Sequence, residues 1–207
     1  MSRIGVLALQ GAFIEHIKML RSLGAEAVEV RLPQDLADVD GLIIPGGEST
    51  TIGKLAVTYG LIEPIKQMAD EGKPIWGTCA GLILLATDVQ GREQSLIGAM
   101  DLTVERNAFG RQADSCEADI PVPALDAVSE PGKTGRPFHA VFIRAPLITS
   151  VGEGVEVLSR LTEAGIVAAR QGMLLATAFH PELTADTRFH RYFLRMVDER
   201  HGTSKKA

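Results

Sequence analysis

Residues 77–81 place a cysteine between two glycines, a spacing suited to nucleophilic catalysis. The segment reads Gly-Thr-Cys-Ala-Gly and joins a predicted strand to a predicted helix, which is the nucleophile-elbow pattern with Cys79 in the serine position. Glycines are needed because side chains beside such a sharp turn would collide. At a helix N-terminus, free N–H groups also favour the thiolate form of a cysteine. A small buried cysteine in a tight turn is the alternative, so the motif needs a partner.

Residues 180–182 supply a partner for this sulfur. They read His-Pro-Glu and directly follow an apolar run that ends at Phe179, so both side chains are expected at the edge of a sheet. Residues two apart in an extended segment face the same side. Glu182 can then hold one imidazole nitrogen of His180 while the other nitrogen faces the sulfur as base and acid. The alternative is a solvated or structural role, as expected for the other histidines, His16, His139, His190 and His201.

A pair of glycines at residues 46–47 follows a predicted strand, at the strand end where α/β folds bind ligands. Backbone N–H groups can approach a substrate closely there, and those of Gly47 and Ala80 are predicted to form an oxyanion hole. A phosphate-binding loop is rejected, because five residues rather than four separate Gly47 from Gly53 and Leu55 replaces the required Ser or Thr. A plain turn is the alternative for these glycines.

Strands and helices alternate in the N-terminal part of the chain. Continuous apolar runs predict buried strands, and apolar residues at helical spacing predict helices between them. The predicted strands are residues 4–9, 27–30, 41–44 and 75–76, and the predicted helices are residues 13–23, 49–59 and 61–70. This alternation is typical of an α/β fold with a mostly parallel central sheet flanked by helices.

The chain changes character after about residue 88, where predicted strands follow one another with few helices between them. These strands are residues 102–106, 140–143, 166–169 and 174–179, and they predict an antiparallel extension of the sheet. Residues 121–137 are rich in Pro and Gly and predict an exposed loop rather than a linker. A final helix is expected over residues 186–200. We therefore predict a single domain, residues 1–200, followed by a polar tail, residues 201–207.

The composition is that of an ordinary globular chain of 207 residues, 45% hydrophobic and 23% charged. A formal net charge of −5 without a basic run argues against nucleic-acid or anionic-membrane partners, which need clustered Lys and Arg. No apolar run approaches the roughly 18 to 20 residues of a membrane span. Two cysteines in unlike settings are too few for a disulfide framework and predict a reducing, cytoplasmic location.

Together these motifs resemble the class I, triad-type glutamine amidotransferases. Further segments are similar, more narrowly, to the glutaminase subunits of pyridoxal phosphate synthase: Gln10-Gly11, Glu48-Ser49-Thr50-Thr51, residues 106–112 (Arg-Asn-Ala-Phe-Gly-Arg-Gln), Phe142-Ile143-Arg144-Ala145-Pro146 and residues 179–184. They extend over nearly the whole chain, so the resemblance implies a class I glutamine amidotransferase-like fold for the predicted domain. The long loop at residues 121–137 and the C-terminal tail depart from this pattern without touching the motifs.

The resemblance implies hydrolysis of L-glutamine to L-glutamate and ammonia, which passes to a separate barrel-shaped synthase subunit that makes pyridoxal phosphate. Cys79 is then the nucleophile, His180 the base and acid, and Glu182 the orienting carboxylate. The family's glutamine-binding positions fall on Gly47, Glu48, Ser49, Arg106, Ile143 and Arg144. A guanidinium suits the α-carboxylate because its planar donors pair with both oxygens, although both arginines also suit surface ion pairs. No metal or cofactor is expected, since pyridoxal phosphate is the product of the pathway.

Other interpretations remain open at this point. A glutaminase subunit of another ammonia-channelling synthase, such as imidazole glycerol phosphate synthase, would share the triad but lack the segment at residues 106–111. A noncatalytic interaction module, or a redox sensor built around the elbow cysteine, has no need of both His180 and Glu182. Glutamate release by the protein with its partner distinguishes these functions. We further expect a docked synthase to reorder residues 10–12 and 46–47 and so complete the oxyanion hole.

Overall fold

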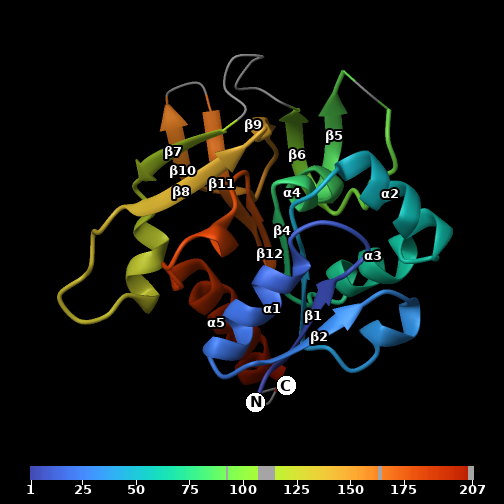
Figure 1. The fold of residues 1–207 in the computed structure, drawn as a ribbon, viewed down its shortest axis with the longest axis horizontal. Coiled ribbons are helices and arrows are strands. Elements are labelled where there is room, and N and C mark those ends of the chain that lie inside the picture. Colours follow the sequence, from blue (N-terminus) through green and yellow to red (C-terminus); the bar gives the residue numbers. More distant parts are fainter. Residues whose placement is uncertain (92, 107–114, 163–164, 205–207) are drawn as a thin grey trace.

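The structure is a computed structural model that describes residues 1–91, 93–106, 115–162 and 165–204 (Figure 1). Its helices and strands, in chain order, are β1 (Arg3–Leu7), α1 (Phe13–Ser22), β2 (Glu26–Val30), β3 (Gly41–Ile44), α2 (Ser49–Thr58), α3 (Ile62–Asp70), β4 (Ile75–Thr78), α4 (Ala80–Leu85), β5 (Ala86–Gln90), β6 (Met100–Glu105), β7 (Ser115–Ile120), β8 (Phe138–Ile143), β9 (Leu147–Val151), β10 (Glu156–Thr162), β11 (Gly165–Gln171), β12 (Leu174–Thr177) and α5 (Arg188–Ser204). Three short 3-10 helices are η1 (Pro33–Leu36), η2 (Pro123–Val128) and η3 (Pro181–Leu183). The α/β class predicted from the sequence is confirmed.

The central sheet has a parallel half and a mostly antiparallel half. Its order is β2-β1-β3-β4-β12-β11-β9-β6-β5, with β10 paired to β11. The strands from β2 to β12 pair in parallel, whereas β11 is antiparallel to β12, β9 and β10. Strand β6 is antiparallel to β9 and parallel to β5. The predicted antiparallel extension is therefore confirmed, and β1, β3, β4 and β12 end at a common edge.

Residues of the parallel strands alternate between two hydrophobic cores, one on each face of the sheet. Ile75 belongs to one core and Trp76 to the other, and Leu42 and Ile43 divide in the same way. Successive side chains of a strand point to opposite faces, so a strand buried on both faces must be apolar throughout. This is why these strands read as continuous apolar runs in the sequence.

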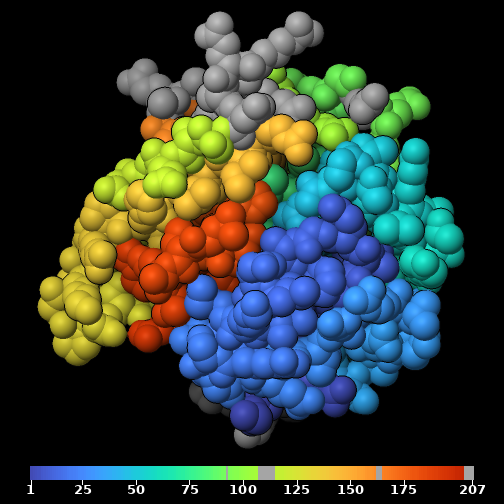
Figure 2. All heavy atoms as spheres, in the orientation of Figure 1, coloured from blue at the N-terminus to red at the C-terminus, as the bar shows by residue number. Residues whose placement is uncertain are grey.

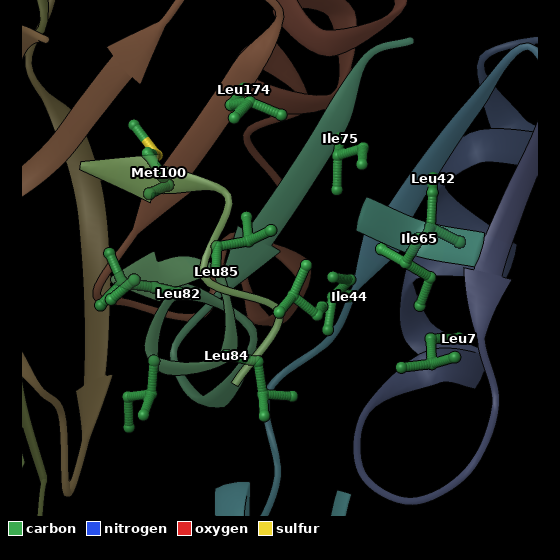
Figure 3. Packing of buried hydrophobic residues seen from close by; sticks show 14 of the residues in the cluster. Leu7, Leu42, Ile44, Ile65, Ile75, Leu82, Leu84, Leu85, Met100 and Leu174 are labelled. Carbon is green, nitrogen blue, oxygen red and sulfur yellow. The ribbon is translucent and has the colours of Figure 1, made fainter. Parts of the chain in front are cut away.

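Helices cover both faces of the parallel half. Side chains of α2, α3 and α4 join the first core, which also holds Leu7, Leu42 and Ile44 of the strands (Figure 3). Side chains of α1 and α5 join the second core with Leu20 and Phe193. Helix α1, in blue, lies beside the orange-red segment that contains η3 (Figure 2). This last contact brings the first helix of the chain next to the His-Pro-Glu segment.

The region between β6 and β9 forms a separate layer. Strands β7 and β8 pair antiparallel, apart from the central sheet, from Ser115 opposite Ile143 to Ile120 opposite Phe138. The expectation that residues 121–137 form an exposed loop is wrong for its first part, because the chain winds into η2 and buries Leu125 completely. Leu125 packs in the same core as α5, so hydrophobic burial overrides the Pro-rich composition there.

The last helix differs from the expected one in its bounds. The last helix, α5, ends at Ser204 and so includes the first residues of the stretch predicted as a tail. Most of residues 106–112 lie outside the described residues, with Arg106 the exception. Across the described part of the chain, no helix combines the length and apolar character that a membrane crossing requires.

Candidate active site

The turn between β4 and α4 places Cys79 in a strained backbone conformation. Its φ is 48° and its ψ is −100°, a region that side chains rarely adopt. A Cβ at Gly77 would lie 2.5 Å from the backbone of Gly81, and one at Gly81 would lie 1.9 Å from the carbonyl oxygen of Ile44. The two glycines thus permit backbone contacts that hold the elbow, as the sequence pattern predicts. The backbone N–H of Cys79 donates to Thr177 O at 2.8 Å and ties the turn to β12.

His180 follows the neighbouring parallel strand, so it emerges at the same edge as Cys79. Residues Thr78 and Thr177 are partners in the β4–β12 register, one and three positions before these two side chains. A Cβ at Gly46 would lie 2.4 Å from Cε1 of His180 and 3.3 Å from Cβ of Cys79. The ends of three neighbouring strands therefore bring the glycine pair, the cysteine and the histidine together.

Glu182 holds the far side of the His180 ring. Its Oε1 lies 2.7 Å from Nδ1 of His180, and its side chain, on η3, is completely buried. With Nδ1 engaged, Nε2 is the ring nitrogen left to serve the sulfur. The structure thus assembles the three side chains in the order that nucleophilic catalysis needs.

The surroundings of His180 raise its pKa from 6.5 to about 10. Burial by itself lowers this pKa, but hydrogen bonds and charge attraction from Cys79 and Glu182 outweigh it. The raised pKa favours the protonated form of the imidazole. This proton is available to a leaving group that must depart as a neutral amine.

The glycine pair is fastened to the loop that follows β1. The N–H of Ala12 donates to Gly46 O at 3.0 Å, and the N–H of Glu48 donates to Gln10 Oε1 at 2.8 Å. Gln10 belongs to a segment that the sequence resemblance singled out, yet it was not assigned a role. Gln10 directly follows the first predicted strand, at the edge of the sheet where the glycine pair is also expected. This is the signal that could have identified it.

Glu48 begins helix α2 and has a structural role in addition to its place at the site. Its carboxylate accepts hydrogen bonds from the N–H groups of Thr50 and Thr51 and from the Thr51 hydroxyl, which is the geometry of a helix N-cap. These bonds, the Thr51 hydroxyl foremost, lower the pKa of Glu48 from 4.5 to about 2. Glu48 is therefore a carboxylate at every pH at which the protein is expected to work.

The two predicted arginines are in different states. Arg106 donates to Gln94 Oε1 at 3.0 Å and to Thr50 Oγ1 at 3.3 Å, and it pairs with Glu48 at 3.4 Å. Arg144 has a φ of 44° and forms no hydrogen bond or ion pair with any other described residue. Strained residues of this kind concentrate at functional sites. Arg144 therefore offers the free guanidinium, while Arg106 is already occupied.

These side chains line one cavity of about 340 Å³, at the small end of the range for small-molecule sites, roughly 300–1,000 Å³. Its walls include every predicted catalytic, oxyanion and substrate-binding residue except Glu182, which lies behind His180: Gly47, Glu48, Ser49, Cys79, Ala80, Arg106, Ile143, Arg144 and His180. The structure adds Gln10 and Ile83 to this set. Ser49 donates to Gln94 Oε1 at 3.2 Å, and Ile143 O lies 4.0 Å from the Cys79 sulfur.

Two of the remaining histidines are buried beside the triad. His16 on α1 and His190 on α5 are both 0% exposed, and His16 Nδ1 lies 2.9 Å from His190 Nε2. The other nitrogen of His16 is 3.3 Å from Glu182 Oε2. By contrast, His139 and His201 are partly exposed and pair with surface carboxylates. Among the described residues, no group of three or more His, Cys, Asp or Glu side chains is placed to hold a metal ion.

Comparisons with known proteins agree on one family. Residues 6–199 match the model of the SNO glutamine amidotransferase family. A protein from Herpetosiphon aurantiacus named pyridoxal 5'-phosphate synthase subunit PdxT is 61% identical over 194 residues, which cover 92% of this chain and 98% of that protein. A protein of the same name from Dehalococcoides mccartyi is 57% identical over 199 residues, covering 95% and 98%.

Solved structures give the same result. A crystal structure of a glutamine amidotransferase superposes with a TM-score of 0.86 at 50% identity, covering 94% of this chain and 98% of that one. The structure of PurLQS from Thermotoga maritima has a TM-score of 0.71 at 17% identity, which shows that the fold is shared. The matched segment contains the elbow, the glycine pair and the His-Pro-Glu turn. This chain belongs to the SNO glutamine amidotransferase family.

Proposed function

We propose that the protein hydrolyses L-glutamine to L-glutamate and ammonia as the glutaminase subunit of a pyridoxal phosphate synthase. The observation that carries this proposal is the arrangement of Cys79, His180 and Glu182 at a cavity of about 340 Å³. Membership of a glutamine amidotransferase family supports the substrate, and relatives named as pyridoxal 5'-phosphate synthase subunits support the pathway.

The chemistry begins when the Cys79 thiol passes its proton to His180 and the resulting thiolate attacks the side-chain amide carbon of glutamine. The N–H groups of Gly47 and Ala80 stabilise the oxyanion of the tetrahedral intermediate, because fixed dipoles need no rearrangement as charge develops. His180 gives its proton to the amide nitrogen, and the C–N bond breaks to release ammonia and leave a thioester. His180 then accepts a proton from water, which attacks the thioester and releases glutamate.

Substrate selection falls to the polar groups of the cavity wall. We assign the glutamine α-carboxylate to Arg144, because its guanidinium is free among the described residues whereas Arg106 is engaged. Arg106 then acts through Glu48, which it pairs with at 3.4 Å. Ser49 and Ile143 complete the wall around the side chain of the substrate.

Ammonia is expected to pass to a separate synthase subunit. Because hydrolysis without that subunit would waste glutamine, we expect docking of the subunit to control hydrolysis. The Gly46–Gly47 peptide is held through its carbonyl oxygen by the N–H of Ala12. A partner that moves the loop of residues 10–12 would release this peptide and let it reorient. One additional oxyanion donor is worth about 3 kcal/mol, or a rate factor on the order of a hundred. The control is expected in kcat rather than KM.

A glutamate-release assay tests the proposal. Purified protein is mixed with a candidate pyridoxal phosphate synthase subunit and L-glutamine, and glutamate and ammonia are measured alongside pyridoxal phosphate. We expect stoichiometric glutamate release that supports synthesis. The imidazole glycerol phosphate synthase barrel serves as the alternative partner. Activation by that barrel alone would reassign the pathway, and absence of hydrolysis with either partner would refute glutaminase activity.

A further inference from the structure

The carboxylate of Glu182 has two oxygens, and His180 accounts for only one. Oε1 pairs with His180 at 2.7 Å, while Oε2 is buried and has no well-aligned hydrogen bond from any described residue. The nearest basic nitrogen is Nε2 of His16, 3.3 Å away. A buried carboxylate is costly without donors on both oxygens. His16 is therefore the residue positioned to complete the environment of Glu182.

Hydrogen-bond chemistry determines where the proton of His16 must lie. Nε2 faces the Glu182 carboxylate and lies at the same time 3.3 Å from Thr78 Oγ1. A carboxylate oxygen only accepts, so the tautomer with its hydrogen on Nε2 is favoured beside Glu182, whereas a bare Nε2 would place two acceptors 3.3 Å apart. In a neutral ring Nδ1 is then an acceptor, and His190 Nε2, 2.9 Å away, must donate to it. In this tautomer His190 donates to His16, and the N–H of His16 faces Glu182 Oε2 at 3.3 Å and Thr78 Oγ1 at 3.3 Å.

The remaining ring nitrogen, Nδ1 of His190, agrees with this placement of the protons. If His190 carries its hydrogen on Nε2, its Nδ1 is a bare acceptor, and Nδ1 is the His190 atom that lacks a partner among the described residues. The opposite tautomer would bury an unpaired N–H, which native structures rarely tolerate. Burial lowers the pKa of both rings, that of His190 to about 3. Both rings are therefore neutral, as the tautomer argument requires.

The two rings are fixed by the core around them. Trp76 contacts both edge-on, with ring centroids 5.6 Å from His16 and 4.9 Å from His190. Its own N–H donates to Thr177 Oγ1 and does not compete for their nitrogens. Helices α1 and α5, far apart in sequence, therefore meet at the triad through this pair.

We propose that His16 is a positioning residue that fixes the second oxygen of Glu182, with His190 setting the tautomer of His16. The proposal rests on the glutaminase function proposed above. By holding Oε2, His16 prevents the carboxylate from rotating away, so the hydrogen bond to His180 keeps the imidazole aimed at the sulfur. Neither His16 nor His190 lines the substrate cavity, so their effect is on turnover rather than on glutamine binding.

Kinetics with matched variants test this role. His16→Leu should lower kcat roughly 10- to 100-fold, which is the size of loss expected when the hydrogen-bond partner that orients a functional side chain is removed. KM should change less than about threefold. His16→Gln, whose amide nitrogen can replace Nε2 as a donor, should recover part of the loss. His139→Leu is the control, because that exposed histidine pairs with the surface carboxylates of Glu117 and Asp119. A wild-type kcat in His16→Leu would overturn the proposal.

A double-mutant cycle separates positioning from general stability. If His16 acts through Glu182, adding His16→Leu to Glu182→Gln should lower kcat little further. A merely structural role would multiply the two losses, and that result would overturn the proposal. Unfolding curves identify the variants that remain folded under assay conditions.

Nitrogen NMR of the unmodified protein decides the geometry without any variant or activity. Histidine labelled with 15N should show both His16 and His190 neutral and protonated on Nε2 at pH 7. A proton on Nδ1 of His16 would overturn the proposed donation to Glu182. If the wild type lacks glutaminase activity, the proposed function fails, and the tautomer measurement still decides whether His16 holds Glu182.

Discussion

The two walls of the cavity are held in place by different kinds of contact. The wall with Cys79 and His180 is formed by residues that follow two neighbouring strands, β4 and β12. The side chain of Glu182 behind it is completely buried. The wall formed by residues 46–48 is a loop, joined to the loop after β1 by hydrogen bonds of 3.0 and 2.8 Å and to helix α2 by the carboxylate of Glu48. The side chain of Glu48 there is 49% exposed.

This difference separates two tasks. Groups that transfer protons must keep a fixed geometry, and the strand ladder and core supply it. Groups that bind the oxyanion and substrate can be adjusted, because local opening of a few exposed hydrogen bonds costs much less than opening the core. We therefore expect changes in the buried wall to eliminate chemistry and changes in the loop wall to modulate it.

The largest effect is expected from Cys79→Ala, which removes the nucleophile of the buried wall. Glutamine hydrolysis should fall by roughly 10⁴-fold or more, while alanine meets the same positive φ as cysteine, so the fold and partner binding should persist. Mass spectrometry should detect a γ-glutamyl thioester in the wild type alone. Ammonia supplied directly should still support the partner's reaction. Substantial residual hydrolysis would contradict the assignment of the nucleophile.

A graded loss is expected along the triad. His180→Asn removes the proton donor and should reduce kcat by about 10²- to 10⁴-fold. Glu182→Gln leaves the imidazole in place but less well oriented, so its loss should be about tenfold smaller. Steady-state kinetics with saturating partner measure the order. Near-wild-type rates in both variants would show that the His-Pro-Glu turn is structural.

A moderate effect is expected on the loop wall. Gln10→Ala removes the acceptor for the Glu48 N–H, a hydrogen bond worth about 1 kcal/mol, and should lower the partner-stimulated kcat about fivefold. Gln67→Ala is the matched control, since Gln67 is on α3 and its side chain bonds Glu71. Equal kcat values for the two variants would mean that the loop does not support the site.

The smallest effect concerns pH and stability at Glu48. Its folded pKa of about 2 lies below the ordinary 4.5, so its contribution to stability is present above pH 4.5 and is lost as the pH falls toward 2. Glu48→Gln should therefore destabilise the protein more at pH 7 than at pH 3. Urea unfolding of both proteins, with the exposed Glu63→Gln as control, measures the difference. A pH-independent difference would refute the capping role.

The positions of the proposed triad side chains and the parallel strands could be predicted because each depends on a short stretch of sequence. The elbow around Cys79 and the turn at His180 are local patterns, and a strand buried on both faces is apolar throughout. The pair of His16 and His190 is different. These residues are 174 positions apart and lie on separate helices, so only tertiary packing brings them together.

Errors in the fold have the same origin. Strands β5, β7, β9 and β10 are not predicted from the sequence, because polar side chains interrupt their apolar residues. The η2 turn was expected to be exposed from its prolines, yet Leu125 is fully buried against α5. In each case pairing or burial by distant residues decides the local structure.

The glycine contacts also constrain how this site can be altered. Gly46 lies against both His180 and Cys79, and Gly81 lies against a strand carbonyl, so neither position can gain even a methyl group without moving its neighbours. Mutagenesis at these two glycines is therefore not expected to yield variants active on new amide substrates. Ile83 and Ile143 also line the substrate cavity, and their side chains can be shortened. Libraries confined to those two positions would explore new specificities while leaving the catalytic frame intact.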